Sequence, residues 1–181
     1  SRIRKISKTP IDLHIISSRP EKFFDGIIST GAEMVSFQFE NLKSPLNIPA
    51  GIRSKLGLAI TSETLPEVFN DYKKQFDFAL FMTTTPGKSG GKFNKENFLK
   101  IRAFKSLYPG KKIHVDGGVN NEISFVLRNM EVSLVVSGSY LVNSDYIGAA
   151  IHNLRSDLTE SHILIKDFMI DKQESPVLVY G

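Results

Sequence analysis

The sequence predicts an α/β domain built on a parallel sheet. Short apolar segments typical of buried strands alternate along the chain with segments of helical periodicity. Strands that alternate with helices pair in parallel through right-handed crossovers, so this order favours one parallel sheet, either doubly wound or closed into a barrel. Six strands are expected, at residues 11–16, 34–39, 56–60, 78–82, 112–116 and 133–136.

Proline, glycine and apolar spacing predict the helices of the first half. Pro20 suits a first helical turn and Gly31 suits the position just after a helix end. The apolar stripe between them consists of Phe23, Phe24, Ile27 and Ile28. Another helix is expected over residues 63–69, with Pro66 in its first turn. Residues 41–55 hold two prolines and little periodicity, so any helix there is short.

Three further helices are expected in the second half. Asn94 can cap the first of them, and Pro109 and Gly110 end it. Its apolar stripe consists of Phe98, Ile101, Phe104 and Leu107. The next helix is centred on three apolar residues, Ile123, Val126 and Leu127. The last helix is expected over residues 145–158.

The end of the chain differs from the repeating strand and helix pattern. Apolar segments at residues 162–170 and 176–180 flank a polar stretch at residues 171–175. This pattern predicts a hairpin or two strands. We therefore expect one domain over residues 1–158 and a C-terminal extension over residues 159–181, which either packs on the domain or forms an oligomer contact.

Composition indicates an ordinary soluble protein. The chain has 181 residues, of which 41% are hydrophobic and 23% charged. Its net charge of +4 suits an anionic small molecule and is too small and scattered to indicate nucleic acid. There is no cysteine, so disulfides and thiolate metal sites are excluded. No apolar run reaches the roughly 18 residues of a membrane span, and we expect a cytoplasmic protein that does not bind membranes.

The stretch that organises the predicted site is residues 112–119. Its β-branched run ends in Asp116, and Gly117 and Gly118 follow at once. A buried parallel strand of this kind delivers a carboxylate to its C-terminal end, and the glycines let the backbone approach a ligand closely. In a barrel of eight β/α units, active sites lie at that end.

Small residues follow three successive predicted strands. They lie at Ser89 and Gly90, at Gly117 and Gly118, and at Gly138 and Ser139. Backbone N–H groups in such loops can point at an anion, and a barrel binds phosphate after its late strands. The three strand ends therefore predict a phosphate site.

His14 allows two interpretations, a core residue or a metal ligand. It lies within the first predicted strand, between Leu13 and Ile15, where a histidine can simply be a core residue. If its strand end meets Asp116 across a barrel mouth, imidazole and carboxylate together suit Zn, Fe, Mn or Co. His114 shares a strand face with Asp116, and we expect a structural role for it.

Four of these segments, in order and spacing, resemble ribulose-phosphate 3-epimerases. They are residues 11–16, 82–93, 115–120 and 136–139. The similarity covers about residues 9–150 and implies a phosphosugar-binding TIM barrel, of which this sequence holds about six β/α units. It also implies epimerisation at C3 of a ketose phosphate, most simply between ribulose 5-phosphate and xylulose 5-phosphate in the pentose phosphate pathway. A phosphorylated ketose as substrate, a divalent metal and a homo-oligomer belong to the same expectation.

The resemblance also implies roles for single residues. His14 and Asp116 fall on metal ligands, and Asp116 falls on one of two acid/base aspartates. Met82 falls on a position that lines the substrate pocket. The phosphate-binding positions are Ser89, Gly90, Gly118, Gly138 and Ser139.

Departures from the family pattern define the alternatives. The family carries further metal ligands and its second aspartate on two strands that precede the segment matched here, so either an N-terminal part precedes Ser1 or the protein is a reduced relative. Gln38 replaces a usual histidine, and Glu40 is the nearest candidate for a second carboxylate. With one acid/base group, the 181 residues are expected to be nearly inactive as an epimerase. A non-catalytic phosphosugar-binding protein and an epimerase of another ketose, such as allulose 6-phosphate, are the alternatives.

Overall fold

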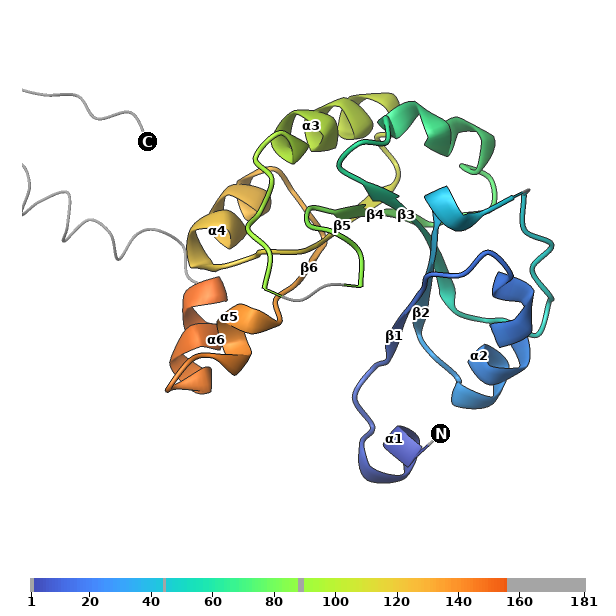
Figure 1. Ribbon diagram of the computed structural model, residues 1–181, viewed down its shortest axis with the longest axis horizontal. Helices are drawn as coiled ribbons and strands as arrows, with labels where there is room; N and C mark the ends of the chain where they lie inside the picture. Colours follow the sequence, from blue (N-terminus) through green and yellow to red (C-terminus); the bar gives the residue numbers. More distant parts are fainter. Residues whose placement is uncertain (1, 44, 88–89, 156–181) are drawn as a thin grey trace, which may run out of the picture.

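The computed structural model describes residues 2–43, 45–87 and 90–155. Its six strands form one parallel sheet in the order β1-β2-β3-β4-β5-β6, which is the order of the chain. They are β1 (Asp12–Ile15), β2 (Met34–Gln38), β3 (Lys55–Thr61), β4 (Phe78–Met82), β5 (Lys112–Asp116) and β6 (Leu134–Val136). Sequential parallel order is that of a barrel rather than of a doubly wound sheet, and the sheet curves into a half-barrel (Figure 1).

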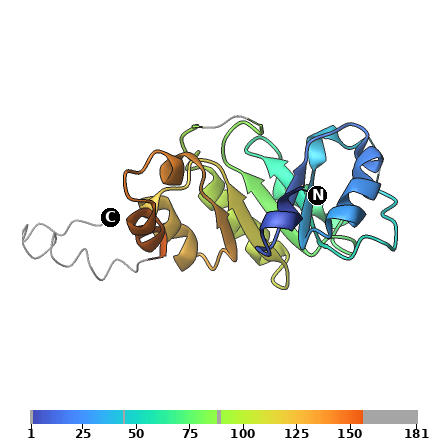
Figure 2. The same cartoon turned by 90° about the horizontal axis from the view of Figure 1, so that it is seen from below.

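Helices cover the convex side of this sheet, while β1 and β6 lie at its two ends (Figures 1 and 2). The α-helices are α1 (Arg2–Ile6), α2 (Phe24–Thr30), α3 (Asn97–Leu107), α4 (Asn121–Asn129), α5 (Ser139–Val142) and α6 (Ile147–Arg155). The 3-10 helices are η1 (Pro20–Phe23), η2 (Phe39–Asn41) and η3 (Pro66–Asp71). No helix in these described stretches is long and apolar enough to cross a membrane.

The strand register separates two faces. His14 lies opposite Ser36, and Met82 lies opposite Asp116. Because side chains alternate along a strand, these residues share the concave face. The alternate positions face the helices and form the main core. Phe37, Phe81, Ile101, Phe104 and Leu127 are among its fully buried members.

Fewer residues of each apolar helical stripe are buried than the sequence predicts. Phe24 and Ile27 are buried in α2, but Phe23 and Ile28 are 46% and 44% exposed. Leu107 at the end of α3 is 49% exposed, and Val126 in α4 is 37% exposed. A single layer of helix on a sheet buries only the residues that point straight at it, so the flanks of each stripe stay at the surface.

Helix ends differ from the prediction in two places. The helix expected over residues 63–69 is the 3-10 helix η3, which begins at Pro66. Asn94 does not cap α3, because its side chain accepts a hydrogen bond from the N–H of Glu96 (3.0 Å) and forms a turn ahead of the helix. By contrast, Gly31 ends α2 in the left-handed conformation at φ 60°, as predicted.

Helix α1 is absent from the sequence-based prediction. Arg4 ties it to the end of α2 by hydrogen bonds to the carbonyl oxygens of Thr30 (3.2 Å) and Gly31 (2.7 Å), and it forms an ion pair with Glu33 (2.6 Å). The last predicted helix corresponds to α6, and residues 156–158 of that prediction lie outside the described residues, as does the predicted extension over residues 159–181.

Candidate functional site

The C-terminal ends of β1, β4, β5 and β6 surround a cavity of about 350 Å³. Its lining includes eight of the nine residues singled out in the sequence: His14, Met82, Gly90, Asp116, Gly117, Gly118, Gly138 and Ser139. The ninth, Ser89, lies outside the described residues. Parallel strands bring these positions together because every strand in the sheet ends on the same side.

The two glycines after Asp116 let the loops around the cavity approach each other closely. Gly117 and Gly118 adopt φ values of 118° and 63°. A Cβ atom on Gly118 would lie 2.3 Å from the backbone N of Phe93, and one on Gly117 would lie 2.8 Å from the N of Thr84. No side chain fits at either position, so the loop after β4 packs directly on the backbone after β5.

Thr83 fixes the same two loops to each other. Its N–H donates to the carbonyl oxygen of Asp116 (2.8 Å). Its hydroxyl lies within hydrogen-bond distance of the carbonyl oxygens of Asp116 (3.0 Å) and Gly117 (2.5 Å). Ser137 adds a third tie, because its hydroxyl donates to the carbonyl oxygen of Val119 (2.8 Å). The backbone that presents Asp116 is therefore held from both neighbouring strands.

Asp116 and His14 have shifted pKa values. Burial raises the pKa of Asp116 above its ordinary value, and the nearby His14 opposes only part of that rise. Burial lowers the pKa of His14. Its hydrogen bond to Gln38 and the nearby carboxylates would raise this pKa, but their effect is smaller than that of burial. A carboxylate with a raised pKa is a stronger base than an exposed one, which suits proton abstraction.

Gln38 and Glu40 lie beside the cavity, and neither lines it. Nε2 of His14 lies 2.8 Å from Oε1 of Gln38, and Nε2 of Gln38 donates to Oε2 of Glu40. Partial burial by itself would raise the pKa of Glu40, but hydrogen bonds from the Thr61 N–H, the Thr64 hydroxyl and Gln38 outweigh it and lower that pKa. The Glu40 carboxylate is therefore occupied by protein donors and is not among the residues that line the cavity.

His114 is a core residue on the concave face. It is 4% exposed, and its ring stacks on Phe78 with centroids 4.0 Å apart. Burial, with a smaller contribution from Lys112, lowers its pKa to about 4. A neutral, buried, stacked imidazole agrees with the structural role expected from the sequence.

A sequence model described as the ribulose-phosphate 3 epimerase family matches residues 1–142. The chain belongs to this family. The epimerase match spans all six strands of the sheet and the whole lining of the cavity, and it ends with α5.

Single epimerases are similar over most of the chain. The ribulose-phosphate 3-epimerase of Eremothecium gossypii is 29% identical over 164 residues, which are 87% of this chain and 69% of that protein. That of Candida glabrata is 29% identical over 160 residues, or 84% of this chain and 65% of the relative. That of Aquifex aeolicus is 29% identical over 164 residues, or 86% of this chain and 73% of the relative.

Solved structures support the barrel fold of the epimerase family. A 3-hexulose-6-phosphate synthase from Salmonella typhimurium has a TM-score of 0.67 at 12% identity, covering 91% of this chain and 77% of that one. A phosphoribosyl anthranilate isomerase from Thermus thermophilus has a TM-score of 0.56 at 15% identity, covering 89% and 76%. At these identities the likeness concerns the fold alone.

The described residues of this epimerase-family chain do not complete a metal site. His14 and Asp116 supply one nitrogen and one carboxylate donor to the same cavity. Within residues 2–43, 45–87 and 90–155, no group of three or more His, Cys, Asp or Glu side chains is placed to hold an ion. Divalent transition metals in proteins usually take about four ligands, so these two donors alone do not fit one.

Several wall residues were not predicted from the sequence of this family member. They are Ile16, Thr84, Gly87, Gly91 and Val136. Ile16 follows His14 by two residues and Val136 ends β6, so the alternation of strand side chains could have indicated both. The hydrogen bonds of Gln38 and Glu40 had no comparable signal, because they depend on side-chain geometry across three strands.

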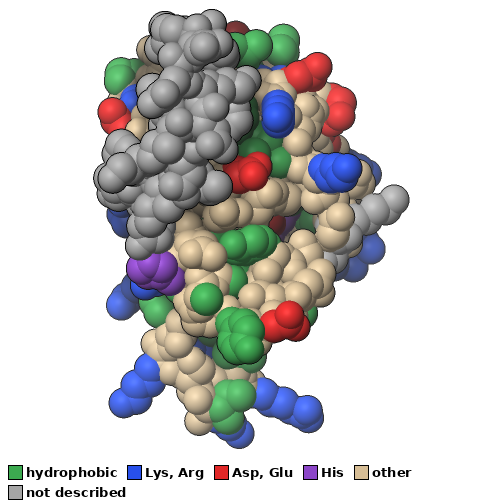
Figure 3. Space-filling model, turned by 90° about the vertical axis from the view of Figure 1, so that its left-hand side faces the viewer, with side chains coloured by type: hydrophobic (Ala, Val, Ile, Leu, Met, Phe, Trp, Pro, Cys, Tyr) green, Lys and Arg blue, Asp and Glu red, His purple; other side chains and the backbone are tan. Residues whose placement is uncertain are grey.

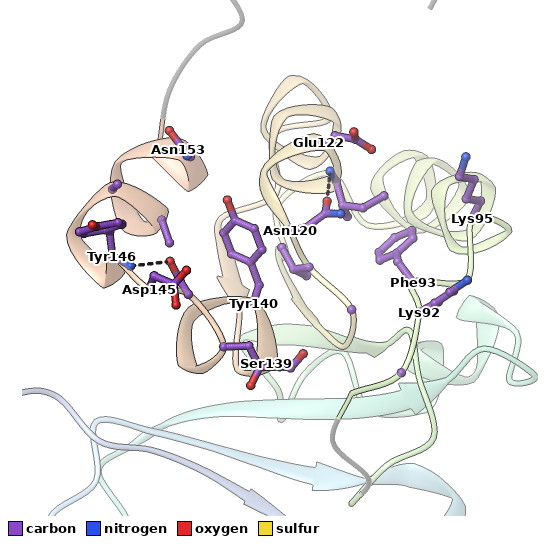
Figure 4. Close-up of a pocket in the computed structure, with 18 residues that line it drawn as sticks. Lys92, Phe93, Lys95, Asn120, Glu122, Ser139, Tyr140, Asp145, Tyr146 and Asn153 are labelled. Carbon is purple, nitrogen blue, oxygen red and sulfur yellow. Dashed lines mark hydrogen bonds between the residues drawn. The ribbon is translucent and has the colours of Figure 1, made fainter.

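A larger cavity of about 860 Å³ adjoins the first and shares Gly91, Gly118 and Ser139 with it. It lies between the loop before α3, the start of α4 and the α5–α6 segment, and Tyr140 projects between Asn120 and Asp145 (Figure 4). The Asn120 side chain accepts from the N–H of Ile123 (2.9 Å) and so caps α4. This capped helix supports one wall of the larger cavity.

Proposed function

We propose that this protein catalyses epimerisation at C3 of a ketose phosphate, interconverting ribulose 5-phosphate and xylulose 5-phosphate. The observation that carries the proposal is the shared cavity of Asp116, His14 and three small-residue loops in a chain of the epimerase family. A carboxylate and backbone amides around one pocket suit a substrate with an acidic carbon at one end and a phosphate at the other.

The first chemical step assigned to Asp116 is removal of the C3 proton. The C3–H electron pair forms a C2–C3 double bond, the carbonyl electrons move to the C2 oxygen, and an enediolate results. Returning a proton to the same face restores the substrate, whereas delivery to the opposite face gives the epimer. Two groups must therefore flank C3 for efficient inversion. Among the described residues that line the cavity, Asp116 is the one carboxylate.

The phosphate is assigned to the glycine loops. Gly90, Gly118, Gly138 and Ser139 come from the ends of three neighbouring strands and line the cavity that Asp116 also lines. Small residues leave backbone N–H groups accessible to an anion. A phosphate held there would fix the sugar so that C3 lies near Asp116, which lowers the entropic cost of the reaction.

Metal dependence is part of this proposal as the family resemblance implies it, with Zn, Fe, Mn or Co as the ion. His14 and Asp116 are the donors offered by the described residues, and the steps assigned above use no metal. A homo-oligomer located in the cytoplasm completes the proposal. A calorimetric titration with each metal tests the donor assignment, and the proposal expects Asp116→Asn to weaken any binding observed.

The proposed reaction is tested by deuterium exchange at C3 of ribulose 5-phosphate, with xylulose 5-phosphate measured in parallel. We expect the 181-residue chain to exchange the proton with little inversion, and Asp116→Asn to abolish that exchange. Asp145→Asn is the matched control, because Asp145 lines the neighbouring larger cavity and not the site. Unchanged exchange in Asp116→Asn, or none in the parent chain, would contradict the assignment.

Two departures from the family pattern support two alternative functions. Gln38 stands where the family usually has histidine, and a single carboxylate lines the described cavity. Both suit a protein that binds a phosphosugar without turning it over, or an epimerase of another ketose such as allulose 6-phosphate. Binding of ribulose 5-phosphate without C3 exchange would favour the first, and exchange with allulose 6-phosphate alone would favour the second.

A further inference from the structure

A chain of side-chain hydrogen bonds runs from β1 to β3 at the edge of the site cavity. At one end, Oε1 of Glu40 accepts from the backbone N–H of Thr61 (2.8 Å) and from its hydroxyl (3.0 Å). In the middle, Oε2 of Glu40 accepts from the side-chain NH2 of Gln38. At the other end, Oε1 of Gln38 lies 2.8 Å from Nε2 of His14.

The direction of every bond in this chain is set from the Thr61 end. A backbone N–H can only donate, so the Glu40 carboxylate accepts there, and an ionised carboxylate has no hydrogen to give at its second oxygen. Gln38 must therefore turn its NH2 toward Glu40 and its oxygen toward His14. Since an amide oxygen can only accept, the hydrogen of this last bond belongs to Nε2 of His14.

We propose that Gln38 and Glu40 are positioning residues that hold neutral His14 in the tautomer with hydrogen on Nε2, which leaves the Nδ1 lone pair as the ring's acceptor. Gln38 is only 2% exposed, so water does not readily replace either of its partners. The inference rests on the proposed function in one respect only, namely the use that the site makes of Nδ1.

The consequence is a single available atom on His14. A substrate hydroxyl that donates to the lone pair of this ring must do so at Nδ1. Second partners of this kind commonly fix the tautomer and the ring orientation of histidines in functional sites. Gln38 thus fixes the tautomer of His14 from a position where the family usually carries histidine.

The test is nitrogen-15 NMR of the histidine side chains in the full chain. We expect Nε2 of His14 to carry the hydrogen and Nδ1 to be unprotonated, with the signals assigned by their loss in His14→Gln. In Glu40→Gln, the new amide keeps its oxygen on the Thr61 N–H and turns its NH2 toward Gln38. Gln38 must then rotate, and the hydrogen of His14 moves to Nδ1.

Glu33→Gln is the matched control, because Glu33 also accepts a backbone N–H, that of Ile11 (2.7 Å), but belongs to another network. It should leave the His14 tautomer unchanged. Hydrogen on Nδ1 in the parent protein, or an unchanged tautomer in folded Glu40→Gln, would overturn the proposal. If Glu40→Gln does not fold, Gln38→Met should give a mixture of both tautomers, and a single unchanged tautomer there would also overturn it. The tautomer is read without turnover, so failure of the proposed reaction does not affect this result.

Discussion

At the scale of single residues, the glycines of the site are required for two separable reasons. Gly118 combines a positive φ of 63° with a neighbouring backbone that leaves no room for a Cβ atom. Gly90 has a similar φ of 83°, but nothing lies within 4 Å of its Cβ position. The pair therefore separates the cost of backbone conformation from the cost of crowding.

We expect Gly90→Ala to lower the free energy of unfolding by about 1 kcal/mol, the usual cost of a left-handed alanine. Gly118→Ala should lower it by about 1–3 kcal/mol more, because the loop after β4 must move away from the added methyl group. Urea unfolding of both variants measures the difference. Equal effects would show that the two loops are not packed as closely as described.

His114 gives the protein a pH-dependent stability. Its pKa is about 4 in the folded state against 6.5 ordinarily, so the unfolded state binds more protons between these values. The contribution of His114 to the free energy of unfolding is fully present above pH 6.5. It is lost as the pH falls from 6.5 toward about 4, and the loss is on the order of 3 kcal/mol. Below pH 4 it no longer changes.

Unfolding free energies measured between pH 7 and pH 4 test this expectation. In His114→Leu, the free energy of unfolding should fall less between pH 7 and pH 4, because the buried group that resists protonation is gone. If the free energy of unfolding of His114→Leu fell with pH as steeply as that of the parent chain, groups other than His114 would cause the pH dependence.

At the scale of elements, the site depends on how the loops after β4 and β5 are tied together. Thr83 is 1% exposed and bonds to the backbone that carries Asp116 and Gly117. The threonine that follows β4 thereby holds the acid-bearing end of β5 in place. This tie crosses 33 residues of sequence, so it forms only once the two strands have paired.

We expect Thr83→Val to lower the free energy of unfolding by about 1–3 kcal/mol, because it removes a buried hydroxyl from two carbonyl oxygens. Any C3 exchange should fall as well, since Asp116 loses one support. The exposed Thr85 in the same loop serves as the control, and Thr85→Val should be close to neutral. The measurements are urea unfolding and deuterium exchange, and a neutral Thr83→Val would mean that the backbone bonds alone hold the loop.

At the scale of the whole molecule, the described part of the half-barrel carries apolar side chains at its surface. Within the described residues, β1 pairs only with β2, and β6 pairs only with β5. The side that carries α5 and α6 shows apolar side chains at its surface (Figure 3), and Val142 and Tyr146 there are each 78% exposed. Exposed apolar side chains are covered when copies of a chain assemble, and this is the basis of the homo-oligomer expected in the proposal.

Sedimentation velocity at increasing protein concentration tests the expected homo-oligomer. We expect association in the parent chain and less of it in Val142→Glu, which places a charge on the exposed α5 surface. Leu99→Glu is the control, because Leu99 is 69% exposed on α3, on the convex side of the sheet. A parent chain that sediments as a monomer at all concentrations would remove the homo-oligomer from the proposal.

The sequence by itself determined the order of strands and helices, the family, and the strand ends at which site residues stand. A continuous apolar run located β4 at residues 78–82, and the position of Asp116 at the end of an apolar run put it at the edge of the sheet. Tertiary structure alone decided that Gln38 links His14 to Glu40, and that Glu40 is occupied by Thr61 and Thr64. The physical reason is the sequence separation of the interacting residues. Periodicity and turn chemistry act between neighbours in the chain, whereas these contacts join side chains from strands whose pairing the sequence does not specify locally.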